Sequence, residues 1–220
     1  MTLDINYWYD IKDKTDAMNR IITNGVTEET FTKDNQDDLD LLESQLDLNL
    51  SDTILDFGCG MGRLMKPLSL KVSRIIGVDV SKAIIQYGQD YCREYNNIEF
   101  VCMPNERFLP NLMGVDKIYS VIALQHIPKF TVHFLISQLY ELLNEGGIMC
   151  LQFPDLLQQK SEVLRGYYAA FNGLIDAVVP LMEFYTEVEL IKWMEMYGLN
   201  DYFFVREKRE DRLWLIIKKN

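Results

Sequence analysis

Short apolar runs separated by amphipathic segments occupy the middle of the chain. Each run is suited to a strand that is buried on both faces, and the runs are 54–57, 75–78, 98–101, 118–122 and 148–151. Helical segments lie between them. This alternation of strand and helix predicts parallel strands joined by right-handed crossover connections.

Polar capping residues and glycines mark the helices between these strands. Ser81 is a suitable N-cap for a helix over 82–95, and Thr131 for a helix over 132–143. The glycine pair 146–147 is expected to be the stop that returns the chain to a strand.

The flanking segments carry different patterns. Before the first strand, residues 17–24 and 37–48 repeat apolar positions every three or four residues, which predicts two amphipathic helices. After the fifth strand, residues 156–179 predict a long helix, rich in Tyr and Phe, that ends at Pro180. We interpret this segment as an insertion that covers the sheet.

The C-terminal part predicts one more helix and two strands. Thr186 and Glu189 form a capping box for a helix that ends at Gly198. Residues 201–206 and 212–218 are predicted strands, close enough in sequence to pair as an antiparallel hairpin.

Together these elements predict an α/β fold. The expected architecture is a doubly wound, mostly parallel seven-stranded sheet with an antiparallel C-terminal hairpin, a helical N-terminal lead-in and a helical insertion after the fifth strand. We expect a single domain over 1–220, made of the lead-in (1–50), a ligand-binding core (51–155), a helical cover (156–182) and a C-terminal helix and hairpin (183–220).

The composition is that of an ordinary globular protein with surplus acid. The 220 residues include 33 acidic and 22 basic side chains, for a formal net charge of −11. Nucleic-acid binding is not expected, because phosphate contacts need a basic surface. Apolar stretches such as 118–124 fall short of the roughly 18 residues that a membrane span requires, and the N-terminus lacks the layout of a signal peptide. We therefore expect a cytoplasmic protein with no nucleic-acid or membrane partner; the pattern does not indicate its oligomeric state.

The cysteines give no sign of a metal site or a disulfide framework. Cys59, Cys92, Cys102 and Cys150 include no CxxC pair and are too sparse for a secreted scaffold. Reduced thiols and no metal are the expectation.

The most informative segment follows the first predicted strand. Gly58, Gly60 and Gly62 stand at alternate positions where the strand runs into a helix, so the backbone can approach a ligand closely. A dinucleotide fingerprint would place its third glycine at position 63, where this chain has Arg63, which weakens a nicotinamide cofactor as the ligand. Asp56, two residues before the first glycine, suits a ligand with an ammonium group. S-adenosylmethionine (SAM) has such a group and no phosphate.

This segment resembles the SAM loop of class I SAM-dependent methyltransferases. The resemblance covers roughly residues 50–155. In that family an acidic residue at the end of the second strand chelates both ribose hydroxyls, and Asp79 stands at the matching place; its two carboxylate oxygens match two adjacent O–H donors. Asp79 follows Asp56 by 23 residues, which leaves room for one helix between them.

Further parts of the chain resemble the family less tightly. Asn105 stands where the family usually has an Asp that accepts from the adenine amino group, and its side-chain carbonyl can also accept. Arg63 is expected either near the carboxylate of SAM or in an ion pair with an acidic residue of the lead-in. The resemblance implies SAM as the cofactor, with contacts from Asp56, Gly58, Cys59, Gly60, Gly62, Arg63, Asp79, Val80, Asn105, Glu106, Ser120 and Ala123.

His126 is the candidate catalytic residue. It follows the fourth strand, at the end of the sheet where open α/β folds bind ligands. Its ordinary pKa near 6.5 would suit a general base at neutral pH. The alternative is that His126 hydrogen-bonds its loop without touching substrate. A missing base would not exclude activity, since alignment of the reactants can be worth about 7–11 kcal/mol.

The expected function is methyl transfer from SAM to an oxygen or nitrogen of a small molecule. The lead-in (Tyr7, Trp8 and Tyr9) and the insertion are the candidate walls of the substrate pocket, and a closed pocket would favour a small acceptor. Two alternatives stay open: a SAM-binding partner or regulatory protein that does not catalyse, and, less favoured, a nicotinamide-dependent oxidoreductase.

Overall fold

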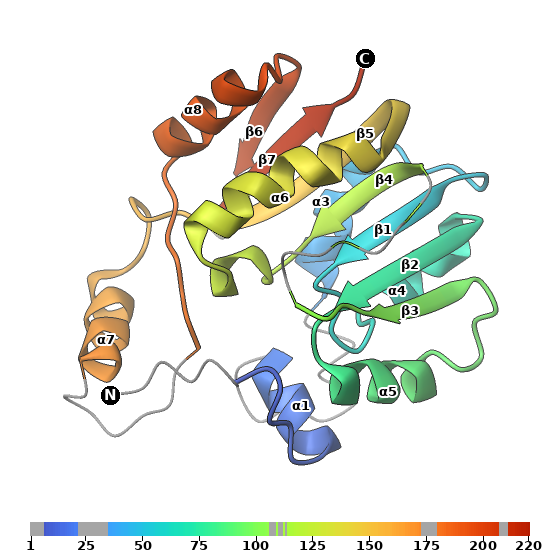
Figure 1. Ribbon diagram of the computed structural model, residues 1–220, viewed down its shortest axis with the longest axis horizontal. Coiled ribbons are helices and arrows are strands. Elements are labelled where there is room, and N and C mark those ends of the chain that lie inside the picture. Colours follow the sequence, from blue (N-terminus) through green and yellow to red (C-terminus); the bar gives the residue numbers. More distant parts are fainter. Residues whose placement is uncertain are drawn as a thin grey trace.

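The described residues of the computed structural model form one mixed sheet; they are 7–21, 35–105, 109, 112, 114–172, 180–206 and 211–220. The sheet has seven strands in the order β3-β2-β1-β4-β5-β7-β6 (Figure 1). Their bounds are β1 Thr53–Phe57, β2 Arg74–Asp79, β3 Ile98–Cys102, β4 Val115–Ser120, β5 Leu143–Pro154, β6 Tyr202–Arg206 and β7 Arg212–Lys218. The pairs among β1 to β5 are parallel, and β7 runs antiparallel to β5 and β6. The predicted sheet, including the antiparallel C-terminal pair, is confirmed.

Helices cover both faces of this sheet. In Figure 1, α6 (Lys129–Leu142) crosses in front of the strands and α3 (Gln36–Leu46) lies behind them. α8 (Glu187–Tyr197) shares the core of α6, while α4 (Met65–Leu68) and α5 (Lys82–Tyr91) lie on the side of α3. Two short 3-10 turns, Ser69–Lys71 and Leu124–His126, complete the connections. The doubly wound arrangement predicted from the sequence is therefore correct.

The N-terminal helix α1 (Lys14–Ile21) packs on α5 through Ala17, Met18 and Ile84. It begins earlier than the predicted helix over 17–24, whose last residues lie outside the described part of the chain. α3 matches the predicted helix over 37–48 within two residues.

Some predicted helix boundaries are wrong. α6 begins directly after Pro128, whose fixed φ suits a helix start, so the expected cap Thr131 lies inside the helix. That helix ends at Leu142, and the glycine pair 146–147 lies within β5, where the Gly146 N–H donates to the Lys219 carbonyl. α5 ends at Tyr91 instead of 95.

The predicted long helix over 156–179 is also wrong. The structure has a shorter helix, α7 (Ser161–Phe171), and residues 173–179 lie outside the described part. α7 is mostly solvent-exposed and stands apart from the sheet in Figure 1. Of the described helices, none is long and apolar enough to cross a membrane.

Candidate functional site

A cavity of about 760 Å³ opens at the carboxyl ends of β1, β2 and β4. Asp56 and Phe57 line it from β1, Asp79 from β2 and Val121 from the segment after β4. Its volume lies within the range of about 300–1,000 Å³ that is usual for small-molecule sites. Parallel strands direct their carboxyl ends to one edge of the sheet, which is why residues far apart in sequence meet there.

The glycine loop forms the floor of this cavity. Gly58, Gly60 and Gly62 all have positive φ, between +55° and +81°. The N–H groups of Gly58 and Cys59 donate to the Val78 carbonyl, at 2.8 and 3.0 Å. The Gly60 N–H donates to the Asp79 carboxylate at 3.0 Å. The loop is thereby folded back onto the end of β2.

Most of the predicted cofactor contacts line the cavity, and some do not. Those that line it are Asp56, Gly58, Cys59, Gly60, Arg63, Asp79, Val80 and Ala123. Gly62 is directed into the protein, since a Cβ there would lie 2.9 Å from the Phe100 ring. The buried Ser120 hydroxyl donates to the Phe57 carbonyl at 2.8 Å and so joins β4 to β1.

The predicted contacts Asn105 and Glu106 are not among the described residues that line the cavity. Asn105 is not part of the described wall, and Met103, two residues earlier, lines it instead. Glu106 lies outside the described residues.

Two buried carboxylates stand at the strand ends. Burial raises the pKa of Asp56 to about 7, against the opposing influence of Tyr119 and Arg63. Burial also raises the pKa of Asp79, although its carboxylate accepts from the backbone N–H groups of Gly60 and Ser81. A cationic or O–H-donating ligand would therefore stabilise the charged form of each carboxylate.

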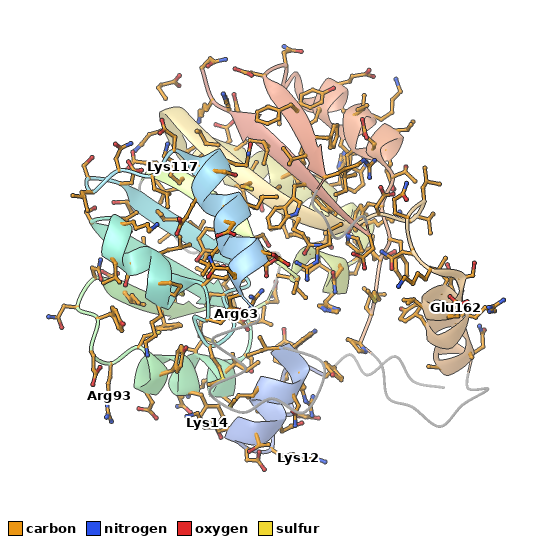
Figure 2. The ribbon with its side chains drawn as sticks, turned by 180° about the vertical axis from the view of Figure 1, so that it is seen from behind. Lys12, Lys14, Arg63, Arg93, Lys117 and Glu162 are labelled. Atoms are coloured by element: carbon orange, nitrogen blue, oxygen red, sulfur yellow. The ribbon has the colours of Figure 1, made fainter. Side chains whose placement is uncertain are left out.

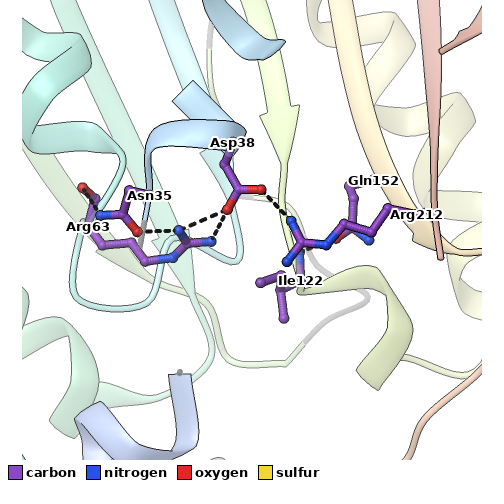
Figure 3. Close-up of polar contacts among 6 residues, drawn as sticks. All are labelled: Asn35, Asp38, Arg63, Ile122, Gln152 and Arg212. Carbon is purple, nitrogen blue, oxygen red and sulfur yellow. Dashed lines mark hydrogen bonds and ion pairs between the residues drawn. The ribbon is translucent and has the colours of Figure 1, made fainter. Parts of the chain in front are cut away.

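Arg63 is committed to a buried ion-pair network. It lies in the turn before α4 and is only 6% exposed. Its guanidinium donates to Asn35 at 2.6 Å and to Asp38 at 3.0 and 3.1 Å, and Asp38 also pairs with Arg212 of β7 (Figure 3). Figure 2 shows Arg63 inside the molecule, whereas Lys12, Arg93 and Glu162 lie at its periphery. Of the two positions predicted for Arg63, the structure shows the ion pair with an acidic residue of the lead-in, which is Asp38 of α3.

Ile122 is a wall residue that the sequence did not reveal. Its φ is +60°, a left-handed conformation that is strained for a β-branched side chain. The buried Gln152 side chain holds it there, because its Oε1 accepts from the Ile122 N–H at 2.8 Å (Figure 3). A strained residue at the mouth of a cavity commonly marks a functional site, but no motif announces such strain in a sequence.

His126 lies in the cavity wall and is held from two sides. Its Nδ1 donates to the Leu181 carbonyl at 2.7 Å, and its ring lies 5.0 Å from that of Trp8. Burial lowers the pKa of His126 to about 4. The imidazole is therefore neutral at pH 7 with its proton on Nδ1, and Nε2, which the Gln125 amide approaches at 3.3 Å, is an acceptor.

Two segments close the cavity. Tyr7, Trp8 and Tyr9 line it from the N-terminal side, where Arg20 lies over the Tyr7 ring, 4.5 Å from its centre, and donates to backbone carbonyls of this segment. Residues 180–183 line it from the other side.

The predicted cover contributes less than expected. Among the described residues of 156–182, Pro180 and Leu181 line the cavity, and Glu183 follows them. Tyr185 lies in the core, and α7 touches the strap of residues 180–183 through the Tyr167 hydroxyl, which accepts from the Met182 N–H at 2.9 Å.

Comparison with known proteins gives the family of the central segment. Residues 54–147 match a family described as "Methyltransferase domain". The central part of the chain therefore carries a methyltransferase domain.

Relatives of this methyltransferase domain differ in the acceptor that their names give. Trans-aconitate 2-methyltransferase of Enterobacter sp. (strain 638) is 32% identical over 122 residues, which are 54% of this chain and 46% of that protein. Phosphoethanolamine N-methyltransferase 3 of Arabidopsis thaliana is 30% identical over 99 residues, or 43% of this chain and 20% of that protein. The chain thus spans less than half the length of these curated relatives.

Solved structures share the fold of the whole chain. Magnesium protoporphyrin IX methyltransferase from Synechocystis PCC 6803 with bound SAM is 17% identical, with a TM-score of 0.67 and coverage of 98% of this chain and 96% of that one. Its complex with S-adenosylhomocysteine (SAH) gives a TM-score of 0.66 at 18% identity, with 94% of each chain covered.

The glycine loop of the methyltransferase domain suits SAM better than a dinucleotide. A pyrophosphate needs backbone N–H donors, but the N–H groups of Gly58, Cys59 and Gly60 are already bonded within the protein. What the loop can still offer a ligand is carbonyl oxygen, which accepts from an ammonium group. The buried carboxylates of Asp56 and Asp79 point to the same kind of ligand.

Proposed function

We propose that this protein transfers the methyl group of SAM to an oxygen or nitrogen of a small molecule. The observation that carries the proposal is the form of the cavity: a floor of glycine loop and carboxylates, closed by aromatic residues 7–9 and by the strap 180–183. A site with such walls admits a small acceptor and excludes a nucleic-acid duplex.

SAM-facing residues divide into a polar and an apolar set. Asp79 is placed to accept from the ribose hydroxyls, and Asp56 to favour the ammonium end through its negative charge. Phe57, Val80 and Met103 supply apolar wall. When bound, SAM supplies an electrophilic methyl group and leaves as a neutral thioether, so no acid is required.

The protein's contribution to the reaction is alignment and exclusion of water. Trp8 packs against His126, and His126 hydrogen-bonds the Leu181 carbonyl of the strap. His126 therefore contacts both segments that close the cavity, residues 7–9 and residues 180–183. Both ring nitrogens of His126 are engaged, Nδ1 by the Leu181 carbonyl and Nε2 by the Gln125 amide, and its pKa is about 4, so in this proposal His126 holds the strap in position and takes up no proton at neutral pH.

We also infer one domain and a cytoplasmic location. The Asp38 network ties the lead-in helix α3 to the glycine loop and to β7, which supports a single domain over 1–220. The sparse cysteines of the sequence, with no CxxC pair, support a reducing compartment.

Calorimetric titration of SAM and SAH tests the proposal directly. Asp79→Asn should weaken SAH binding at least tenfold, because charge-assisted hydrogen bonds of about 1.5–3 kcal/mol are at stake. The exposed Asp90 on α5 provides the control, and Asp90→Asn should bind SAH normally. Unchanged affinity of Asp79→Asn would remove the ribose assignment.

Turnover separates catalysis from binding alone. Incubation with methyl-labelled SAM and a panel of small amines, alcohols and acids should yield labelled product. Tight SAH binding with no transfer to any acceptor would favour the non-catalytic SAM-binding protein.

A further inference from the structure

Most charged residues of the described cavity wall are acidic. Its described residues include the carboxylates of Asp56, Asp79 and Glu183, and a single cation, Arg63. The terminal nitrogens of Arg63 donate within the protein, to Asn35 and to Asp38, whose carboxylate also pairs with Arg212. The whole chain adds to this field with a net charge of −11, which draws cations toward the site and repels anions.

Glu183 is the carboxylate left for the acceptor. In the proposed function SAM engages Asp56 and Asp79 at the strand ends, whereas Glu183 belongs to the closing strap. The backbone N–H of Glu183 donates to the carbonyl of Gln125 at 2.8 Å. Because Gln125 directly precedes His126, this bond holds Glu183 close to the His126 loop. Within the described part of the chain, no Lys or Arg pairs with the Glu183 side chain.

The charge of Glu183 affects the pKa values of two tyrosines, Tyr185 and Tyr167. Burial and then the charge of Glu183 raise the pKa of Tyr185, and its charge also contributes to the raised pKa of Tyr167. A half-buried carboxylate without a partner cation is costly, and a cationic ligand would relieve that cost.

The neighbouring walls suit a cation as well. Trp8 and Tyr9 present aromatic rings, whose faces attract cations. His126 is neutral and brings no positive charge to the wall. The described wall beside Glu183 therefore offers aromatic surface and no further cation besides Arg63.

We propose that the methyl acceptor is a small amine that enters this cavity as its ammonium ion and is held by Glu183 and the aromatic wall. The proposal rests on the proposed function and narrows it from oxygen or nitrogen to nitrogen. It also sets this chain apart from its trans-aconitate 2-methyltransferase relatives, whose names give a carboxylic acid as substrate.

The reaction balances without another reactant. The bound ammonium loses a proton to water, and the amine lone pair then forms the new N–C bond to the methyl group. The S–C bond breaks with its electron pair left on sulfur. The positive charge passes to the methylated nitrogen, which keeps the product complementary to Glu183.

A matched set of probes tests the charge preference whatever the natural acceptor is. After SAH binding is established by calorimetry, benzylammonium, benzyl alcohol and benzoate are titrated into the SAH complex at neutral pH. They share a ring and differ in charge. We expect benzylammonium to bind at least tenfold more tightly than benzoate, with benzyl alcohol between them.

The role of Glu183 is tested by Glu183→Gln, which keeps the shape and removes the charge. This variant should lose most of the preference for benzylammonium while binding SAH as the wild type does. The control is Glu195→Gln, at an exposed ion pair with Lys192 on α8, which should change neither.

The outcomes are distinct. Failure to bind SAH overturns the proposed function itself. With SAH bound, equal affinities for the charged probes, binding of neither, or a preference for benzoate overturns the amine proposal and leaves methyl transfer standing. A preference for benzylammonium that survives Glu183→Gln overturns the assignment of Glu183.

Discussion

A methyl group added at Gly58 would collide with the segment that follows β4. A Cβ built at this position lies 2.2 Å from the Cβ of Ala123, and the φ of Gly58 is +77°. For alanine the positive φ costs about 1–2 kcal/mol. Overpacking costs about 1–3 kcal/mol. Gly58→Ala should therefore lower the free energy of unfolding by about 2–5 kcal/mol, the sum of these two contributions.

Gly146 provides a control with the same backbone and no clash. Its φ is +78°, and a Cβ there would meet nothing within 4 Å. Gly146→Ala should lose only the backbone contribution. In a chain of this size each kcal/mol corresponds to about 2–4 °C in Tm. Calorimetry should thus show Tm lower by about 2–8 °C in Gly146→Ala, and by roughly a further 2–12 °C in Gly58→Ala.

The clash can be relieved from the other side. The double variant Gly58→Ala/Ala123→Gly moves the methyl group from one residue to the other, so its loss should be smaller than the sum of the single losses by about 0.5–3 kcal/mol. Because Gly58 lines the cavity, Gly58→Ala should also weaken SAH binding, whereas Gly146→Ala should not. Equal Tm losses at the two glycines, or strict additivity in the double variant, would refute this account of the loop.

Other predictions concern the buried polar groups. Because the pKa of Asp56 is raised to about 7, its contribution to stability is present below about pH 4 and is lost as the pH rises through 7, by up to about 4 kcal/mol. Thermal unfolding across pH 5–8 should show this decline in the wild type and not in Asp56→Asn; parallel curves would contradict it. Since the pKa of His126 is lowered to about 4, His126 should contribute no inflection in kcat near pH 6.5, and His126→Phe should speed amide hydrogen exchange in residues 180–183; an inflection near 6.5 that is present in Asp56→Asn would support His126 as a general base. Gln152→Leu leaves the Ile122 N–H without its acceptor and should cost about 1–3 kcal/mol in urea unfolding, while Gln152→Glu keeps an acceptor oxygen and should cost less.

The sheet and its ligand edge could be predicted because their signals are local. A run of apolar residues such as Ile75–Val78 is long enough to specify a buried strand, and the glycines after Phe57 specify a turn that only glycine adopts easily. In parallel strands, residues at consecutive carboxyl ends must share one edge. Asp56 and Asp79 stand at two such strand ends, and the structure puts both in one cavity.

Other parts of the site depend on contacts between distant segments. Arg63 pairs with Asp38, and Ser120 bonds the Phe57 carbonyl, and neither choice is visible in the residues beside them. Gly62 belongs to the same glycine pattern as Gly58, yet it faces Phe100 of the neighbouring strand. A side chain or a glycine spacing defines what a position can do, whereas the packing of other elements decides which possibility is used.

The sequence by itself determined the buried strands, the glycine loop and the acidic residues at the strand ends, because each depends on a few neighbouring residues. Only the tertiary structure decided how the cavity is closed. The strap 180–183, which follows the predicted helix 156–179, closes it on one side, and hydrogen bonds from its backbone to His126 and Gln125 hold it there. The tertiary structure also decided that His126 is neutral and that Ile122 is strained, since burial and long-range hydrogen bonds set a pKa and hold a backbone angle.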